Sequence, residues 1–232
     1  MGAQWKQKHR VAAADQRGRL FGKLAKEVMM AARGGADPAL NAALRLAIDT
    51  AKKHSLPRDT LERAIKKGAG LLDGPLNLEL VTYEGFAPHQ VPVIVECLTD
   101  NKNRTASSMR VLFRKGQQGA SGSVSWDFDR RGVIEAQPPA QGEDPEEAAI
   151  EAGADDVRPA DDGAQAFLTA PDQLDAVGRA LSERGWNIES SALAWLAKNP
   201  VTLEAGAREE VEAWLENMDA DDDVQNIYVA LA

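Results

Sequence analysis

The chain has 232 residues, a formal net charge of −9, 44% hydrophobic residues and a single cysteine. Because this length exceeds that of most single domains, we expect two or three compact units. The longest apolar run, residues 91–98 with Glu96 inside it, is far too short to span a membrane, which argues against an integral membrane protein. A lone cysteine and the lack of an apolar secretory signal predict a cytoplasmic protein without disulfides.

Charge is distributed unevenly along the chain. Residues 1–70 contain 15 Lys and Arg against six Asp and Glu, residues 71–131 contain seven of each sign, and residues 132–232 contain five against 23. The first segment therefore carries +9 and the last carries −18. Clustered cations bind a phosphate backbone through counterion release, so we expect the basic third to dock on nucleic acid. The alternative is that these cations only form solvated helix faces. A mitochondrial transit peptide would also be basic, but such peptides are serine-rich and the first serine here is Ser55.

Three amphipathic helices are predicted in the basic third, over residues 10–33, 38–54 and 58–67. Asp37 and Pro38 suit the N-cap and first turn of the second helix, while Pro57 and Gly68 bound the third. The stripes expected to face the core are Leu20, Leu24 and Val28, then Leu40, Leu44 and Ile48, then Leu61, Ala64 and Ile65.

A change to alternating periodicity predicts a sheet after residue 75. The first expected strand is the segment in which Leu76, Leu78 and Leu80 alternate with other residues. A buried strand over 91–98, a helix over 103–115, and a strand in which Val124, Trp126 and Phe128 alternate are expected to follow. This order is β-β-α-β. A helix over 206–218 and a strand over 224–231 would complete that unit, since they cannot form a core alone.

Between these parts, residues 132–196 predict a strand at 132–136, a helix at 145–152, strands near 155–158 and 164–169, a helix at 171–184 and a strand at 187–196. The order β-α-β-β-α-β is ferredoxin-like. The predicted fold is thus α+β: an N-terminal three-helix domain at 1–75, followed by two ferredoxin-like α/β domains. The third domain, at 132–198, is inserted into the second, at 76–131 and 199–232.

The candidate nucleic-acid contacts are cations of the helical segment, one aromatic residue among them, and two cations of the 100–105 loop. Trp5 lies between Gln4 and Lys6 and suits stacking on a base. The 100–105 loop joins a strand to a helix start, where helix amides and cations together suit a phosphate, although Asn103 or Asp100 acting as a helix cap is an alternative. The residues are Trp5, Lys6, Lys8, Arg10, Arg17, Arg19, Lys23, Lys52, Lys53, Arg58, Arg63, Lys66, Lys67, Lys102 and Arg104.

Other polar and aromatic features predict structure rather than chemistry. The glycine-rich segment 116–123 follows a helix and precedes a strand, the reverse of a nucleotide-binding loop, so a turn is favoured over a phosphate contact. The three histidines are scattered, Cys97 suits a strand core, and the acidic run 219–223 lacks the glycine and glutamate of a calcium loop. The tryptophans expected in the core are Trp126, Trp186, Trp195 and Trp214. No catalytic residue, metal, cofactor or small-molecule substrate is predicted.

Several separated stretches form a specific pattern. They are Trp5 with Lys8-His9-Arg10, residues 17–21, residues 56–68, Tyr83-Glu84-Gly85-Phe86, residues 96–105 and Gly122-Ser123-Val124. Together they resemble the YebC family, also called the transcriptional regulatory or translational activator of cytochrome oxidase family. The resemblance implies a helical first domain and two α/β domains, the third inserted within the second, and no catalytic residues. Members are described as DNA-binding transcriptional regulators and as ribosome-associated factors that help translation through proline-rich stretches.

The chain departs from the family pattern at its start and at two turns, which suggests a divergent paralogue. A Gly-His-Ser-Lys-Trp start is replaced by residues 2–5, a Gly-Pro-Gly-Gly turn by residues 87–90, and Gly-Gly-Asn-Leu-Gly by residues 116–120. The leading hypothesis is a non-catalytic factor that grips rRNA or tRNA on the ribosome. A DNA-binding regulator at promoters is the alternative, and an enzyme with an unrecognised site is a remote one. No heptad repeat predicts a dimer helix, which favours a monomer.

Overall fold

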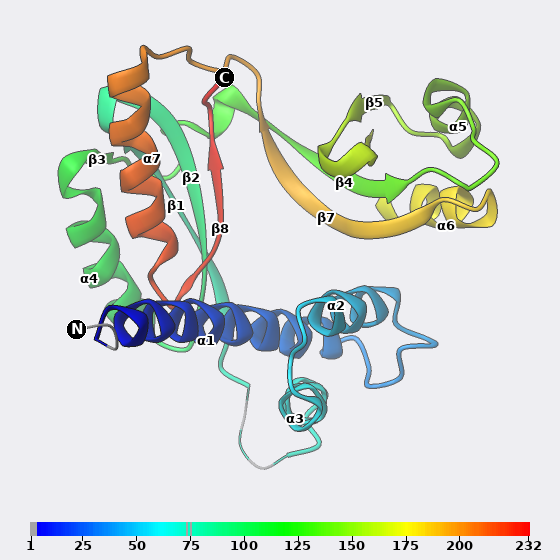
Figure 1. Cartoon of the computed structure of the whole chain (residues 1–232), viewed down its shortest axis with the longest axis horizontal. Coiled ribbons are helices and arrows are strands. Elements are labelled where there is room, and N and C mark those ends of the chain that lie inside the picture. Colours follow the sequence, from blue (N-terminus) through cyan, green and yellow to red (C-terminus); the bar gives the residue numbers. More distant parts are fainter. Residues whose placement is uncertain (1–3, 73, 75) are drawn as a thin grey trace. The chain divides into compact units, whose positions relative to one another are not determined.

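The computed structural model describes residues 4–72, 74 and 76–232, with side chains from residue 17 onward. It divides into two compact units (Figure 1). The first unit combines residues up to 121 with 203–227, and the second combines residues 122–202 with 228–232. Helices and two four-stranded sheets occur within the described residues, so the predicted α+β class is confirmed.

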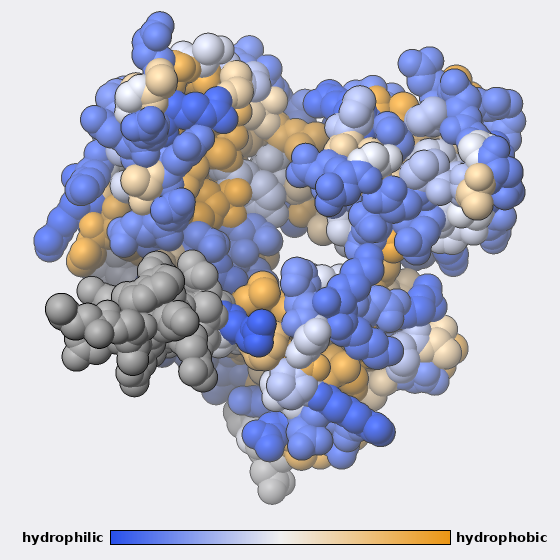
Figure 2. Space-filling model, viewed as in Figure 1, coloured by the Kyte–Doolittle hydropathy of each residue, from blue (hydrophilic) through white to orange (hydrophobic). Residues whose placement is uncertain are grey.

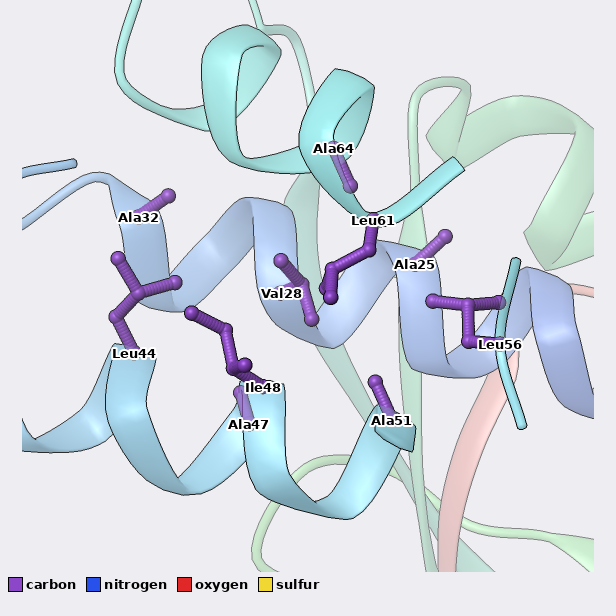
Figure 3. Close-up of a cluster of buried hydrophobic side chains, with 10 residues drawn as sticks. All are labelled: Ala25, Val28, Ala32, Leu44, Ala47, Ile48, Ala51, Leu56, Leu61 and Ala64. Atoms are coloured by element: carbon purple, nitrogen blue, oxygen red, sulfur yellow. The ribbon is translucent and has the colours of Figure 1, made fainter. Parts of the chain in front are cut away.

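The first unit begins with three helices that share one core. They are α1 (Gln4–Ala32), α2 (Ala42–Lys53) and α3 (Arg58–Gly68), and both α2 and α3 pack against α1. Figure 3 shows their buried side chains meeting: Ala25, Val28, Ala32, Leu44, Ala47, Ile48, Ala51, Leu56, Leu61 and Ala64. The predicted positions Leu44, Ile48 and Leu61 are buried as expected. Gly68 allows α3 to approach α1 closely, because a Cβ there would lie 2.7 Å from the Cβ of Ala32.

Two predictions about the second helix are wrong. Its N-cap is Asn41, whose Oδ1 accepts from the backbone N–H of Leu44 at 3.0 Å. The Asn41 side-chain amide also donates to the carbonyl of Ala31 at 2.8 Å, so one residue caps α2 and ties it to the end of α1. Asp37 caps only a turn, by accepting from the N–H of Ala39. Because the helix starts after residue 40, Leu40 is not on its buried face and is 89% exposed.

The sheet of the first unit has the order β3-β1-β2-β8. Its strands are β1 (Glu79–Ala87), β2 (Val91–Thr99), β3 (Gln117–Gln118) and β8 (Val224–Val229), and its helices are α4 (Lys102–Leu112) and α7 (Ala205–Asp219). Helices α4 and α7 lie against each other, since the Trp214 indole donates to the carbonyl of Leu112 at 2.9 Å (Figure 1). The ring of Phe113 meets Trp214 edge-on, with the ring centroids 5.4 Å apart.

The start of this sheet differs from the predicted alternation. Strand β1 begins only at Glu79, because the carbonyls of Leu76 and Leu78 accept hydrogen bonds from the Arg33 guanidinium instead of from a partner strand. Leu80 is exposed rather than buried. The connection from β1 to β2 is a short 3₁₀ turn, Pro88–Gln90.

The second unit contains the predicted ferredoxin-like succession. Its elements are β4 (Phe128–Gln137), α5 (Pro145–Ala152), β5 (Asp156–Pro159), β6 (Gln165–Thr169), α6 (Leu174–Glu183) and β7 (Asn187–Ala197). The antiparallel sheet has the order β5-β6-β4-β7, and the predicted element order is confirmed. Phe167 and Trp186 meet edge-on in its core with centroids 4.9 Å apart.

The predicted strand through Val124, Trp126 and Phe128 is wrong. Residues 125–127 form a 3₁₀ turn (Ser125–Asp127), and β4 then runs without interruption from Phe128 across position 131, where the sequence places a domain boundary. The turn forms because the Asp127 N–H donates to the carbonyl of Val124, and the Asp127 carboxylate accepts from Asn199 at 2.6 Å. Trp126 is therefore 69% exposed instead of buried. The three-domain boundaries stay a prediction.

Candidate nucleic-acid interface

Several exposed cations of the basic third lie on α2 and α3. Both helices end in a lysine pair, which the negative end of a helix dipole stabilises. At about 100° per residue, Arg63 and Lys66 point away from the side of α3 that buries Leu61. In the face shown in Figure 2, hydrophilic residues dominate the surface over α3. We define the α2–α3 cationic surface as Lys52, Lys53, Arg63, Lys66 and Lys67.

Two exposed ion pairs lie on α2 and α3. Arg58 Nε lies 2.8 Å from Glu62 Oε1, and Lys52 Nζ lies 4.0 Å from Asp49. The hydrogen bond from Arg58 lowers the pKa of Glu62, so this carboxylate is ionised at neutral pH. Exposed pairs of this kind contribute little stability and exchange partners readily. The cations involved therefore stay accessible to a phosphate.

Two lysines of α1 bind carboxylates and carbonyls of distant segments of the protein. Lys23 Nζ lies 2.6 Å from Asp219 Oδ1 and also donates to the Asp219 carbonyl, with only 13% of its side chain exposed. Lys26 donates to the carbonyls of Leu98 and Asp222. These bonds join α1 to the end of α7, to the acidic segment after it and to β2. Of the candidate residues on α1, Lys23 is thus engaged within the protein.

The cations of the 100–105 loop also lie beside carboxylates, although more than half of each side chain is exposed. Arg104 Nη2 lies 2.9 Å from Asp223 Oδ2 and 2.9 Å from Asp100 Oδ1. Lys102 Nζ lies 2.5 Å from Glu79. The cap of α4 is Asn101, which accepts from the N–H of Arg104 at 3.1 Å, so the expectation of Asn103 or Asp100 as cap is wrong. The structure brings Lys102 and Arg104 to carboxylates of the same unit.

Asp223 is the centre of these contacts. Its buried carboxylate accepts hydrogen bonds from Arg104, from Thr105 Oγ1 at 2.9 Å and from Thr99 Oγ1 at 3.2 Å, and Lys26 Nζ lies 3.1 Å away. Burial by itself raises the pKa of Asp223, but the hydrogen bonds from Arg104, Thr105 and Lys26 outweigh it, and the pKa is lowered. Sequence reasoning missed this cluster because residues 26, 104 and 223 are far apart in the chain.

The remaining candidate residues of α1 fall into two groups, those whose side chains are described and those whose side chains are not. Arg17 is exposed and Arg19 is half-buried beside Lys23. The side chains of Trp5, Lys6, Lys8 and Arg10 lie outside the described residues, although their backbone belongs to α1.

A cavity of about 720 Å³ in the first unit is less suited to a polyanion than the α2–α3 cationic surface. Its charged lining consists of Lys26, Lys67, Arg104, Asp100 and residues 221–223. Three cations thus face four carboxylates, which leaves no positive excess inside the cavity.

Cys97 is buried beside Met109, as predicted for a core residue, and burial raises the pKa of its thiol to about 12. Within residues 4–72, 74 and 76–232, no group of three or more His, Cys, Asp or Glu side chains is placed to hold a metal ion. In the same residues no helix combines the length and hydrophobicity needed to cross a membrane.

Comparison with known proteins matches both parts of the chain to one family. Residues 2–71 match the TACO1/YebC protein N-terminal domain, and residues 78–231 match the TACO1/YebC second and third domain. The chain belongs to the TACO1/YebC family. The resemblance noted in the sequence is thereby confirmed over nearly its whole length.

Relatives of the TACO1/YebC family extend over the full chain. A protein from a Polaromonas species is 61% identical over the whole of both chains, and one from Pseudomonas syringae is equally similar. Both are named probable transcriptional regulatory proteins. The crystal structure of a conserved hypothetical protein from Aquifex aeolicus superposes with a TM-score of 0.81 at 42% identity, covering 94% of this chain and 90% of that one.

Proposed function

We propose that this TACO1/YebC-family protein is a non-catalytic regulator of gene expression that docks on RNA of the ribosome, rRNA or tRNA, through the α2–α3 cationic surface. The observation that carries the proposal is the exposure of the five cations of that surface, in contrast to Lys23, of whose side chain only 13% is exposed. Clustered, accessible cations release counterions when they meet phosphates. The protein would act in the cytoplasm as a monomer and needs no cofactor.

The charges on the outer face of α3 favour contact with phosphates over the recognition of base edges. Asp59 and Glu62 are exposed on the same side of the helix as Arg63 and Lys66. A recognition helix inserted into a DNA major groove is surrounded by phosphates, which these carboxylates would repel. Docking through the lysine pairs at the helix ends avoids that repulsion. Recognition by shape and phosphate is typical of proteins that bind folded RNA.

A DNA-binding transcriptional regulator is the second candidate, and the names of the relatives favour it. In that case the same cations would contact the phosphates of promoter DNA. The two candidates share the surface and differ in the nucleic acid recovered from cells.

Crosslinking in cells followed by sequencing of bound RNA and bound DNA tests the proposal. We expect enrichment of rRNA or tRNA fragments, lost in a variant that carries Lys66→Glu and Lys67→Glu. Recovery of promoter DNA with no RNA enrichment would overturn the RNA assignment and support the second candidate. If neither nucleic acid depends on the two lysines, both candidates are wrong, and a search for catalytic activity becomes the next step.

A further inference from the structure

A groove of about 930 Å³ lies between α4 and α7 in the first unit. Ligand pockets commonly have volumes of about 300–1,000 Å³, so this groove can hold several side chains of a partner. Its apolar lining consists of Pro88, Val111, Leu112, Ala213 and Trp214. No residue of the α2–α3 cationic surface lines it, so the proposed contact with RNA does not account for the groove.

The floor of the groove is fixed and its rim is open. At the floor, the Trp214 indole donates to the Leu112 carbonyl at 2.9 Å and joins the two helices. Trp214 is buried, with the ring of Phe113 edge-on to it. At the rim, Ala213 is exposed and Val111 is 53% exposed. The last turn of α4 therefore presents an apolar side chain to solvent beside a preformed hollow, where a partner loses little entropy on binding.

The α4 side of the groove carries cations that have no carboxylate partner. Arg114 and Lys115 line the groove and are exposed, and Arg110 is exposed one turn earlier in α4. No acidic residue occurs between Asp100 and Asp127, and no other stretch of the chain without one is as long. Within the described part of the chain, the ion pairs of this stretch involve its other two cations and none of these three. Their charges are therefore available to a partner.

The α7 side of the groove is acidic, which favours a protein occupant over a nucleic acid. Glu210 lines the groove, and its Oε2 lies 2.9 Å from Nε2 of His89. Further exposed carboxylates of α7 are Glu209, Glu212 and Glu216. A nucleic acid carries a negative charge on every nucleotide, so it would be repelled along α7. A peptide can direct acidic side chains toward α4 alone. An apolar centre with a charged rim is typical of protein interfaces.

We infer that the α4–α7 groove docks an amphipathic segment of a partner protein, with an acidic flank toward α4. Apolar side chains of this segment enter the groove between Val111 and Ala213. Its acidic side chains pair with Arg110, Arg114 and Lys115. A helix binds a groove of this kind through apolar residues at positions i, i+3, i+4 and i+7. The inference goes beyond the proposed function, because it adds a protein partner on a surface that RNA does not use.

Photocrosslinking of the full chain in cells tests the inference. The photoreactive amino acid p-benzoylphenylalanine is placed at Val111, and at Ile150 in the control, because Ile150 is a 78% exposed apolar residue of the second unit. We expect a protein adduct at position 111 that is absent at position 150. Mass spectrometry of the adduct should identify an amphipathic segment with a net negative charge. No adduct, adducts with RNA alone, a basic segment, or the same adducts at both positions would overturn the inference.

A synthetic peptide of the crosslinked segment then tests the charge pattern by fluorescence anisotropy. Arg114→Glu with Lys115→Glu should weaken its binding about 10-fold, because two attractions become repulsions. Arg63→Glu with Lys66→Glu changes the net charge of the first unit equally and is the matched control. We expect it to keep the wild-type affinity, since neither residue lines the groove. Ala213→Phe fills the hollow without changing charge and should also weaken binding.

The peptide measurements can also contradict the groove as the docking site. Equal weakening by the two double variants would show that the peptide responds to total charge. Unchanged binding in Ala213→Phe would show that the peptide does not enter the hollow. Either result would overturn the inference, whereas the RNA binding of the Arg63→Glu with Lys66→Glu variant tests the proposed function separately. Circular dichroism of each variant confirms that a loss of binding is not a loss of fold.

Discussion

Replacing Asp223 should destabilise the first unit strongly, because this carboxylate joins α1, β2 and α4. Truncation to alanine leaves Lys26 and Arg104 without their shared anion and removes the acceptor of Thr105 Oγ1. Losing one partner of a fully buried ion pair costs about 3–5 kcal/mol. The Arg104 side chain is half-exposed, so water recovers part of that loss. We expect Asp223→Ala to lower the free energy of unfolding by about 2–3 kcal/mol.

Urea denaturation followed by far-UV circular dichroism measures this loss, with Asp223→Asn as the isosteric comparison. The pKa of Asp223 is lowered from its usual 3.8, so the charged carboxylate stabilises the fold fully above pH 3.8. That stabilisation is lost as the pH falls below 3.8 through the folded-state pKa. The stability difference between wild type and Asp223→Asn should therefore shrink in acid. A loss below about 1 kcal/mol in Asp223→Ala, or a difference that does not change with pH, would refute the reasoning.

Two backbone positions give further predictions. Gly68→Ala should destabilise the helical part by about 1–3 kcal/mol, because its Cβ would meet the backbone of Met29, whereas Gly18→Ala, with open space around it, should be neutral or slightly stabilising. Equal thermal midpoints for the two variants by calorimetry would contradict the close approach of α3 to α1. Gln90 has φ +60° in the turn where the family pattern has glycine, so Gln90→Gly should raise stability by about 0.5–1 kcal/mol. A lower thermal midpoint would show that the left-handed conformation is not strained.

Local signals in the sequence predicted most of the elements. The helix expected over 145–152 forms over those residues, and the strand expected over 91–98 extends by one residue. The errors occur where two local signals compete. Asp37-Pro38 and Asn41 both suit a helix start, and only the tertiary bond from Asn41 to Ala31 decides between them. The alternation at Val124, Trp126 and Phe128 resembled a strand, but the long-range bond from Asn199 to Asp127 favours a turn.

The sequence predicted which cations belong to the candidate site, but not which of them are exposed to solvent. Net charge located the basic third, and the exposed lysine pairs of α2 and α3 were among the predicted contacts. The engagement of Lys23 by Asp219 was not predictable, because the two residues are 196 positions apart. A sum of charges cannot distinguish a cation that faces solvent from one that neutralises a distant carboxylate. The fold therefore shows that Lys23 is engaged within the protein, whereas the cations of the α2–α3 cationic surface are exposed.

The salt dependence of binding to a structured rRNA fragment tests the central claim most directly. Five phosphate contacts predict a slope of log affinity against log salt near about −4.5, and Lys66→Glu with Lys67→Glu should reduce it to about −2.7. Arg158→Glu with Arg179→Glu changes the net charge equally in the second unit, and should leave the slope near about −4.5. Equal slopes for the two double variants would contradict the account, because binding would then follow total charge rather than the surface of α2 and α3.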